Sequence, residues 1–242
     1  LSLHDALPIC YKSPYRHLDR LTRVYEYMGP AWYQREIEIP AAWKGKRIFL
    51  YFERTHWLSS VYVGKEEVSK IDYISIPHNH ELTQWLHPGK KELITFCIDN
   101  RYQYDTHKWD HAHSEFTQIN WNGVLGEIKL VAVDPVYVDD MQVYPDIKNK
   151  SIKVKMTVRN CTEHTASGKI SFHVSGKDYR LQKEVPVTVT DSITYIEEEM
   201  FLSKDIHLWN EFHPNLYTLD CKLTSSVEGQ SYAHEKSTTF GM

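Results

Sequence analysis

The sequence has few cysteines, no surplus of basic residues and no long apolar segment. Cys10, Cys97, Cys161 and Cys221 form no CxxC pair, which argues against a zinc ribbon and against a disulfide-stapled scaffold. The 28 Lys and Arg residues are outnumbered by 32 Asp and Glu residues, so nothing indicates binding to nucleic acid or to an anionic membrane. No apolar run approaches the roughly 18 residues that span a bilayer. We therefore expect a soluble protein with no nucleic-acid or membrane partner. Its compartment is not readable, although a periplasmic or secreted location is compatible with the sequence.

Aromatic residues, by contrast, are abundant. They make up 13% of the 242 residues, with 7 Trp and 16 Tyr among them. Strands favour aromatic side chains, so packing within β-sheets is the preferred explanation. The alternative is a surface on which aromatic faces stack against the C–H groups of sugars, and composition leaves that alternative open.

The two ends of the sequence look cut. Residues 1–9 lack an initiator methionine and the pattern of a signal peptide. They look like a translated sequencing-adaptor tail, so they are left out of the fold prediction. The sequence stops at Phe240–Met242, directly after a strand-like run. We therefore expect an interior slice of a longer protein.

Short segments with alternating apolar and polar residues predict an all-β fold. In Ile152–Val158 the apolar residues fall on one face of a strand. Such segments recur about every ten residues, which is typical of β-sandwiches. A break at Asp134-Pro135 separates a sandwich over residues 10–133 from a second over 135–242, which has seven predicted strands and the size of an immunoglobulin-like domain. The predicted strands are Trp32–Ile39, Arg47–Phe52, Ser60–Val63, Glu92–Ile98, Gly126–Val133, Val136–Val143, Ile152–Val158, Gly168–Val174, Tyr179–Val189, Ser192–Met200, Leu216–Leu223 and Ser231–Phe240.

A series of motifs resembles glycoside hydrolase family 2, the family of β-galactosidases, β-glucuronidases and β-mannosidases. Each motif alone is weak, but their order and spacing over residues 20–242 are specific. The motifs are Tyr27–Arg35, Trp43–Arg47, Val61–Gly64, Gln118–Gly126, Val143–Asp146, Leu208-Trp209 and Pro214–Tyr217.

The resemblance implies a jelly-roll sugar-binding domain followed by an immunoglobulin-like β-sandwich. In the family a (β/α)8 barrel comes next and carries the two glutamates of a retaining mechanism. The sequence contains no counterpart of that barrel, so we expect no catalytic residue in this chain. Asn210-Glu211 imitates the acid/base motif, but it lies inside the pattern of the second sandwich and not at a barrel rim.

The polar segment around residue 120 is the strongest candidate for contact with a sugar. Gln118, Asn120 and Asn122 can donate to and accept from hydroxyl groups, and the face of Trp121 supplies apolar contact. Asn120 matches the asparagine of an Asn-Tyr-x-Gly segment in glucuronidase-like relatives. The alternative is structural: Asn120 and Asn122 cap a turn before the next strand and Trp121 packs inward.

This segment closes a long polar loop, Asn100–Asn122, which is rich in histidine and aromatic residues. Loops of this length in compact domains are usually functional. His107, His111 and His113 have spacings that can bind zinc, but the glutamate of a zincin is missing. We therefore expect no metal and no cofactor, and His113 is assigned to a substrate cleft.

Two functions follow from these observations. The first is the non-catalytic N-terminal portion of a retaining exo-β-glycosidase, with a carbohydrate substrate, the missing barrel as its intramolecular partner and a possible homo-oligomeric state. The alternative is a free-standing carbohydrate-binding or adhesion module made of two β-sandwiches.

Overall fold

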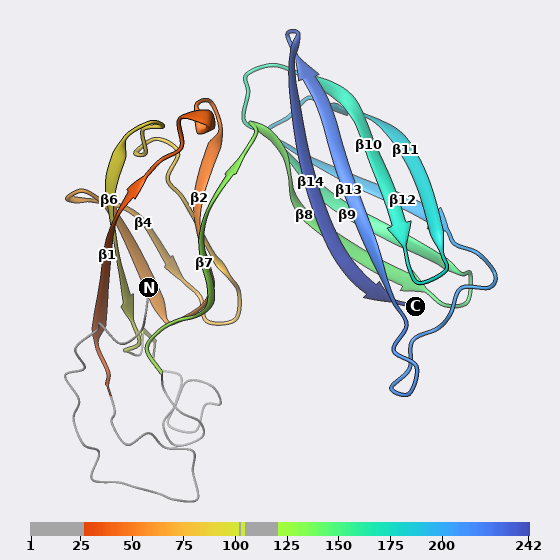
Figure 1. Cartoon of the computed structure of the whole chain (residues 1–242), viewed down its shortest axis with the longest axis horizontal. Helices are drawn as coiled ribbons and strands as arrows, with labels where there is room; N and C mark the ends of the chain where they lie inside the picture. The colour runs from red at the N-terminus through yellow and green to blue at the C-terminus, as the bar shows by residue number, and fades with distance from the viewer. Residues whose placement is uncertain (1–26, 102, 105–120) are drawn as a thin grey trace, which may run out of the picture. The chain divides into compact units, whose positions relative to one another are not determined.

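A computed structural model describes residues 27–101, 103–104 and 121–242 of the chain (Figure 1). The chain divides into two compact units, Leu1–Ala132 and Val133–Met242. Apart from one short 3-10 helix, η1 (Ala41–Trp43), the regular structure of the described residues consists of β-strands. The predicted all-β architecture is therefore confirmed. None of the helices in the described part of the chain is long and apolar enough to cross a membrane.

The first unit is a sandwich of two sheets. One sheet has the order β1-β6-β3-β4 and contains β1 (Pro30–Glu38), β3 (Leu58–Val63), β4 (Glu66–Asp72) and β6 (Lys91–Asp99). The other has the order β5-β2-β7 and contains β2 (Arg47–His56), β5 (His78–Glu81) and β7 (Gly123–Val133). Alternating residues of the strands point between the sheets and form the core. Its largest fully buried side chains include Ile48, Phe52 and Ile98.

The strand β5 is absent from the sequence prediction, and its composition explains why. The segment His78–Glu81 consists of polar residues only, so it shows no alternation of apolar and polar side chains. His78 and His80 are nevertheless 0% exposed. Their ring nitrogens lie within hydrogen-bond distance of Ser59 Oγ, at 2.6 Å and 2.8 Å. Hydrogen bonding to β3 of the opposite sheet therefore takes the place of apolar burial in this strand.

The second unit contains all seven strands predicted for it. One sheet, in the order β12-β9-β8, contains β8 (Val136–Asp146), β9 (Ser151–Asn160) and β12 (Ile193–Phe201). The other, in the order β11-β10-β13-β14, contains β10 (Ala166–Ser175), β11 (Arg180–Val189), β13 (Leu216–Val227) and β14 (Gln230–Gly241). The period-2 pattern of β9 and β10 points alternate residues into one core around Phe172, Ile170 and Val154.

Tyr217 helps to hold the long segment between β12 and β13 against the second unit. The Tyr217 hydroxyl donates to the His207 carbonyl oxygen at 3.1 Å and accepts from the His207 backbone N–H at 2.9 Å. The ring itself is 4% exposed and packs edge-on against Tyr179. A buried tyrosine that bonds to upstream backbone near the start of this strand is a feature of immunoglobulin-like sandwiches.

Tyr217→Phe is therefore expected to destabilise the chain by about 1–2 kcal/mol, because two backbone groups lose a shared partner while the ring stays packed. Urea unfolding followed by circular dichroism measures the change. Tyr195→Phe is the matched control, since Tyr195 is 78% exposed, and should leave the midpoint unchanged. Equal midpoints for the two variants would mean that the Tyr217 hydroxyl does not hold this segment.

Candidate functional site

Four strand ends meet at one end of the first sandwich. Pro30 at the start of β1 pairs with Asp99 at the end of β6, and Asp99 also pairs with Leu58 at the start of β3. The backbone N–H of Trp57, just after β2, donates to the Asp99 carbonyl at 3.2 Å. Side chains that lie immediately beyond these strand ends are thereby brought together. We call Gly29, His56, Asn100, Trp121 and Asn122 the loop-anchor cluster.

Asn100 is the centre of the loop-anchor cluster. Its side chain is 0% exposed and bonds to two other segments of the chain. Asn100 Oδ1 accepts from the Gly29 N–H at 2.9 Å, and Nδ2 donates to the carbonyls of Tyr27 at 2.8 Å and Trp121 at 3.2 Å. Asn100, which opens the long loop, is therefore bonded directly to Trp121 at the far end of the loop and also to the segment before β1.

Trp121 also contacts His56. The His56 ring lies 5.1 Å from the Trp121 ring, tilted by 35°, and its Nδ1 donates to the Trp121 carbonyl at 3.0 Å. Because the carbonyl can only accept, this bond requires a proton on Nδ1. His56 is 1% exposed, whereas Trp121 is half-buried, so part of the tryptophan remains open to solvent.

Asn122 both anchors the chain and leaves one atom unpartnered. Its Nδ2 donates to the Gly29 carbonyl at 2.7 Å, which fixes the start of β7 against the segment before β1. Its Oδ1 is buried and has no hydrogen-bond partner among the residues that the structure describes. A buried amide oxygen without a donor is costly, so a ligand hydroxyl placed there would supply a missing hydrogen bond.

Asp99 and Arg101 form a tight turn at the exit of β6. Asp99 Oδ1 accepts from the Arg101 backbone N–H at 3.0 Å, and the Arg101 guanidinium bonds to both carboxylate oxygens. Burial raises the pKa of the Asp99 carboxyl, but the hydrogen bonds from Arg101 outweigh it, so the pKa lies below its usual value. The carboxylate therefore stays charged and is committed to its own turn.

The residues predicted to contact sugar are only partly covered by the structure. Trp121 and Asn122 belong to the loop-anchor cluster, while His113, Gln118 and Asn120 lie outside the described residues. His107 and His111 lie outside them as well. The contacts of Trp121 and Asn122 are those of positioning groups. Trp121 nevertheless keeps part of its indole exposed, and Asn122 keeps a buried amide oxygen without a hydrogen-bond partner among the described residues.

Three members of the loop-anchor cluster, Gly29, His56 and Asn100, were not predicted as site residues. Of the two that contribute side chains, His56 ends β2 and Asn100 directly follows β6, and each is polar next to an apolar run. That position is the only sequence signal that could have singled them out. Among the described residues, no group of three or more His, Cys, Asp or Glu side chains is arranged to hold a metal ion.

The motif Asn210-Glu211 has a structural role in the second unit. Asn210 Oδ1 accepts from the backbone N–H groups of Phe212 at 3.0 Å and His213 at 2.8 Å, which caps a turn. Glu211 is exposed at that turn.

Comparison with known proteins relates both units to glycosidases. Residues 136–242 match the family model for glycosyl hydrolases family 2. A β-galactosidase of Thermoanaerobacter pseudethanolicus is 22% identical over 205 residues, which covers 84% of this chain and 27% of that enzyme. A β-glucuronidase of Paenibacillus borealis is 22% identical over 247 residues, which covers 96% of this chain and 39% of that enzyme. The chain thus spans about a quarter to two-fifths of the length of these relatives.

Solved structures show the same fold. A putative β-galactosidase from Bacteroides fragilis superposes with a TM-score of 0.75 at 18% identity, over 92% of this chain and 34% of that protein. A β-glucuronidase 2 from Bacteroides uniformis gives a TM-score of 0.73 at 17% identity, over 90% of this chain and 27% of that protein. These matches, together with the family model, confirm the resemblance of the chain to glycoside hydrolase family 2.

Proposed function

We propose that this chain, with its resemblance to glycoside hydrolase family 2, is the non-catalytic N-terminal portion of a retaining exo-β-glycosidase of the β-galactosidase or β-glucuronidase type. One observation carries the proposal. The chain aligns along 84% and 96% of its own length with enzymes of which it represents 27% and 39%. The rest of such an enzyme has room for a catalytic barrel.

The carboxylates of the second unit support a non-catalytic role. Retaining glycosidases need two carboxyl groups about 5–5.5 Å apart that face one glycosidic bond. The acidic run Glu197–Glu199 lies on β12, where neighbouring side chains point to opposite faces. Glu197 pairs with Lys155 at 2.9 Å, and Glu198 pairs with Lys183. These carboxylates neutralise lysines on β9, which pairs with β12, and on β11 of the other sheet, and are not held ready for acid–base chemistry.

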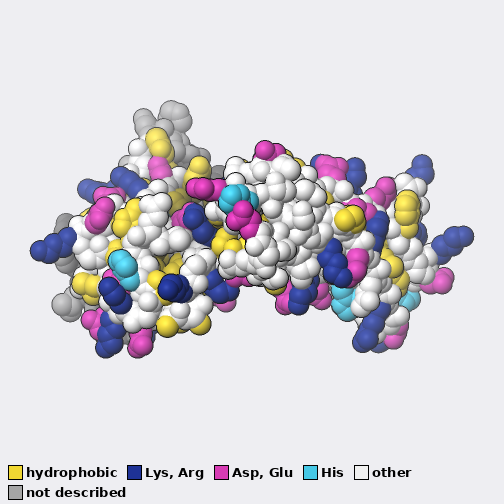
Figure 2. Space-filling model, turned by 90° about the horizontal axis from the view of Figure 1, so that it is seen from above, with side chains coloured by type: hydrophobic (Ala, Val, Ile, Leu, Met, Phe, Trp, Pro, Cys, Tyr) yellow, Lys and Arg dark blue, Asp and Glu magenta, His cyan; other side chains and the backbone are white. Residues whose placement is uncertain are grey.

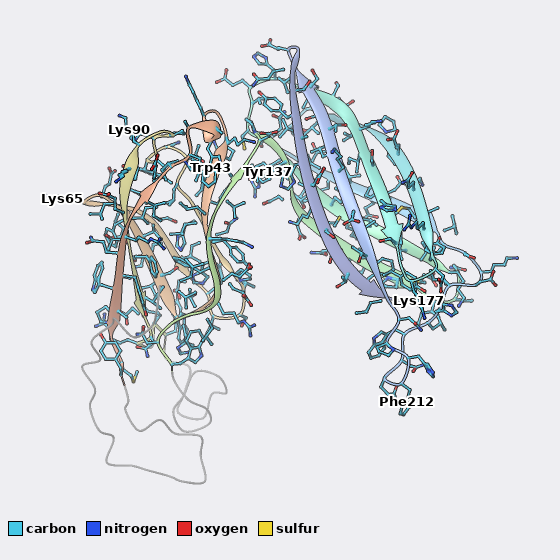
Figure 3. All side chains as sticks on the ribbon, viewed as in Figure 1. Trp43, Lys65, Lys90, Tyr137, Lys177 and Phe212 are labelled. Atoms are coloured by element: carbon cyan, nitrogen blue, oxygen red, sulfur yellow. The ribbon has the colours of Figure 1, made fainter. Side chains whose placement is uncertain are left out.

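An exposed apolar loop supports an intramolecular partner next to the second unit. Phe212 is 81% exposed, Leu216 58% and Trp209 50%. Figure 3 shows Phe212 at the tip of a loop that extends away from the strands. The Trp209 N–H donates to the Met242 carbonyl at 2.7 Å, so this surface adjoins the last described residue. Exposed large apolar side chains that cluster in this way mark interaction sites, and the barrel of the same polypeptide is the partner we propose.

The first unit would shape the sugar pocket of the whole enzyme. We propose that Asn120, Trp121, Asn122, Gln118 and His113 contact the substrate. In this arrangement Asn100 fixes both ends of the loop, and Asn122 Oδ1 is the acceptor for one sugar hydroxyl. The bond between Asn122 Nδ2 and the Gly29 carbonyl orients that amide before a sugar arrives.

The test starts from the coding DNA. The reading frame is followed beyond the codon for Met242, and the extended protein and the 242-residue chain are assayed on p-nitrophenyl β-galactoside, β-glucuronide and β-mannoside. We expect turnover with retention of anomeric configuration by the extended protein and none by the 242-residue chain. An extended protein that cleaves none of the three, or cleavage by the 242-residue chain alone, would contradict the proposal. A stop codon directly after Met242 would favour the free-standing carbohydrate-binding module.

Asn122→Ala in the extended protein tests the proposed sugar contact. Loss of a hydrogen bond worth about 1–1.5 kcal/mol should raise KM by roughly fivefold to tenfold. Asn79→Ala is the matched control, since Asn79 is exposed on β5 away from the loop-anchor cluster. An unchanged KM for Asn122→Ala would remove Asn122 from the substrate site.

A further inference from the structure

The outer face of the sheet β1-β6-β3-β4 presents a set of aromatic and polar side chains that the proposed function does not use. Ile94, Phe96, Ile98 and Val61 point inward to the core, so the residues that alternate with them point outward. The strand register places Trp32, Cys97, Ser60 and Lys70 in one row across the sheet. Gln34, Thr95, Tyr62 and Glu67 form the next row. We call Trp32, Gln34, Tyr62, Glu67, Lys70 and Thr95 the sheet-face platform.

Two aromatic rings meet at the centre of the sheet-face platform. Trp32 on β1 and Tyr62 on β3 lie on either side of β6, yet their ring centroids are 5.5 Å apart with a 43° angle between the planes. Cys97, which lies between them on β6, is 8% exposed although it faces outward. Trp32 itself is 57% exposed. The two rings therefore form a tilted aromatic surface, and its tryptophan is more than half exposed to solvent.

Hydrogen-bonding groups surround this aromatic pair. Gln34 Nε2 donates to Thr95 Oγ1 at 2.8 Å, which orients the amide across β1 and β6. The Tyr62 hydroxyl donates to Glu67 Oε2 at 3.2 Å, which orients the carboxylate at the other side. Lys70 is exposed on β4 beside them. Oriented donors and acceptors are thus spaced around an apolar centre.

This arrangement matches a neutral sugar better than it matches other ligands. A pyranose ring has an apolar C–H face that can lie on an aromatic ring and hydroxyls that both donate and accept. From β1 to β3 the platform spans two strand spacings, about 10 Å, which is enough for more than one sugar ring. The acidic residues Glu67, Asp72 and Asp99 outnumber the cations Lys70 and Arg101, and Arg101 is already bound by Asp99. The platform therefore has no surplus of positive charge that would favour binding of a negatively charged sugar.

A protein partner fits the platform less well. The centre of a protein interface is apolar and depleted of charge. Here Trp32 is the one platform side chain that is both strongly apolar and more than half exposed, and the charged side chains of Glu67 and Lys70 occupy the β4 edge of the platform. On the face of the molecule that Figure 2 shows, charged side chains of both signs are interspersed.

We propose that the sheet-face platform is a binding site for a neutral oligosaccharide, with Trp32 and Tyr62 as the stacking surface and Gln34, Glu67 and Lys70 as hydroxyl partners. This site is separate from the loop-anchor cluster, and its occupancy does not depend on glycosidase activity. It would hold a carbohydrate chain on the surface of the first unit.

The test uses the 242-residue chain and the probes lactose, cellobiose and mannobiose, followed by NMR of the indole N–H groups. At least one probe should bind with millimolar affinity and shift the Trp32 signal. Trp32→Ala and Tyr62→Ala should each weaken binding by about tenfold, or about 1.4 kcal/mol. Trp32→Phe, which keeps an aromatic face, should retain most of it. Tyr195→Ala is the matched control, because Tyr195 is 78% exposed on β12 of the second unit, and should bind as the unchanged chain does.

Four outcomes would overturn the proposal. They are absence of binding by all three probes, binding that survives both alanine substitutions, binding of glucuronate in preference to the neutral sugars, and a concentration-dependent dimer that Trp32→Ala abolishes. Circular dichroism of each variant verifies folding, and Trp32→Phe keeps the test decisive if an alanine variant unfolds. Catalysis by the extended protein is a separate measurement, so failure of this site and failure of the proposed function are distinguishable.

Discussion

Asn100→Ala is expected to destabilise the first unit by about 2–4 kcal/mol, because the substitution removes a buried amide that makes three hydrogen bonds. The loss exceeds that of an ordinary hydrogen bond because the Gly29 N–H and two carbonyls are left without this partner. Urea unfolding monitored by tryptophan fluorescence is the appropriate measurement. Six of the seven tryptophans precede residue 133, so the emission reports mainly on the first unit.

The control for Asn100→Ala is Asn79→Ala, which deletes the same amide from an exposed position. Asn79→Ala should shift the unfolding midpoint little, since surface substitutions usually change stability by less than about 0.5 kcal/mol. Asn100→Asp offers a finer comparison. It keeps the acceptor for Gly29 but removes the Nδ2 donor, so a carboxylate would face the carbonyls of Tyr27 and Trp121. If Asn100→Ala is no less stable than Asn79→Ala, Asn100 does not anchor the loop.

The first unit is also expected to lose stability between neutral pH and about pH 4.5, by about 3 kcal/mol from His80 alone, because two histidines are buried in their neutral form. Burial, with a smaller contribution from His78, lowers the pKa of His80 to about 3. Burial also lowers the pKa of His78, against the opposing hydrogen bond to the Tyr73 carbonyl. In the unfolded chain each would titrate near 6.5. Unfolding therefore takes up protons below that pH, and stability falls as the pH falls from 6.5 toward 3.

The hydrogen bonds explain why neutral histidines suit this position. His78 Nε2 must donate to the Tyr73 carbonyl at 2.9 Å, which leaves Nδ1 to accept from Ser59. The Ser59 oxygen then accepts from His80 Nε2, and His80 Nδ1 accepts from Ser69 Oγ at 2.8 Å. The Tyr73 carbonyl thus fixes the His78 proton on Nε2, and Thr55 Oγ1, 3.0 Å from Nδ1, is a second donor to the other ring nitrogen. A second proton on either ring would place a donor where an acceptor is needed.

His80→Gln tests this account, because glutamine keeps a donor and an acceptor but does not titrate. As the pH falls below 6.5, the free energy of unfolding of the variant should decrease less steeply than that of the unchanged chain. The expected difference in slope is about 1.4 kcal/mol per pH unit. His87→Gln is the control, since the His87 side chain is 61% exposed and bonds to Glu92 at the surface. Parallel slopes for the unchanged chain and His80→Gln would show that His80 does not govern the acid response.

The second unit was the more predictable of the two. Its seven strands follow from apolar alternation in segments such as Ile152–Val158, because each strand buries one face in a single shared core. In the first unit the same rule found β1, β2, β3, β6 and β7. It missed β4 and also β5, whose buried residues are histidines. An alternating apolar pattern reveals a strand only when apolar side chains are buried, so it does not reveal a strand such as β5, whose buried side chains are polar and hydrogen-bonded.

The candidate site divides in the same way. Trp121 and Asn122 could be singled out because an amide and an indole before a strand suit sugar contact, and because the surrounding motif resembles a known family. His56 and Asn100 could not, since their importance lies in contacts with residues 65 and 73 positions away in the chain. The pairing of Trp32 with Tyr62 was equally hidden, because only the strand order β1-β6-β3 brings the two rings together.

The sequence by itself determined the all-β class, the seven strands of the second unit and the resemblance to glycoside hydrolase family 2, because these depend on local alternation and on the order of motifs along the chain. The tertiary structure alone decided which polar residues are buried and what satisfies them. It placed His78 and His80 against Ser59, tied both ends of the long loop to Asn100, and set Trp32 beside Tyr62 on the open face of a sheet. Each of these depends on strand register and sheet order, which bring together side chains that are far apart in sequence.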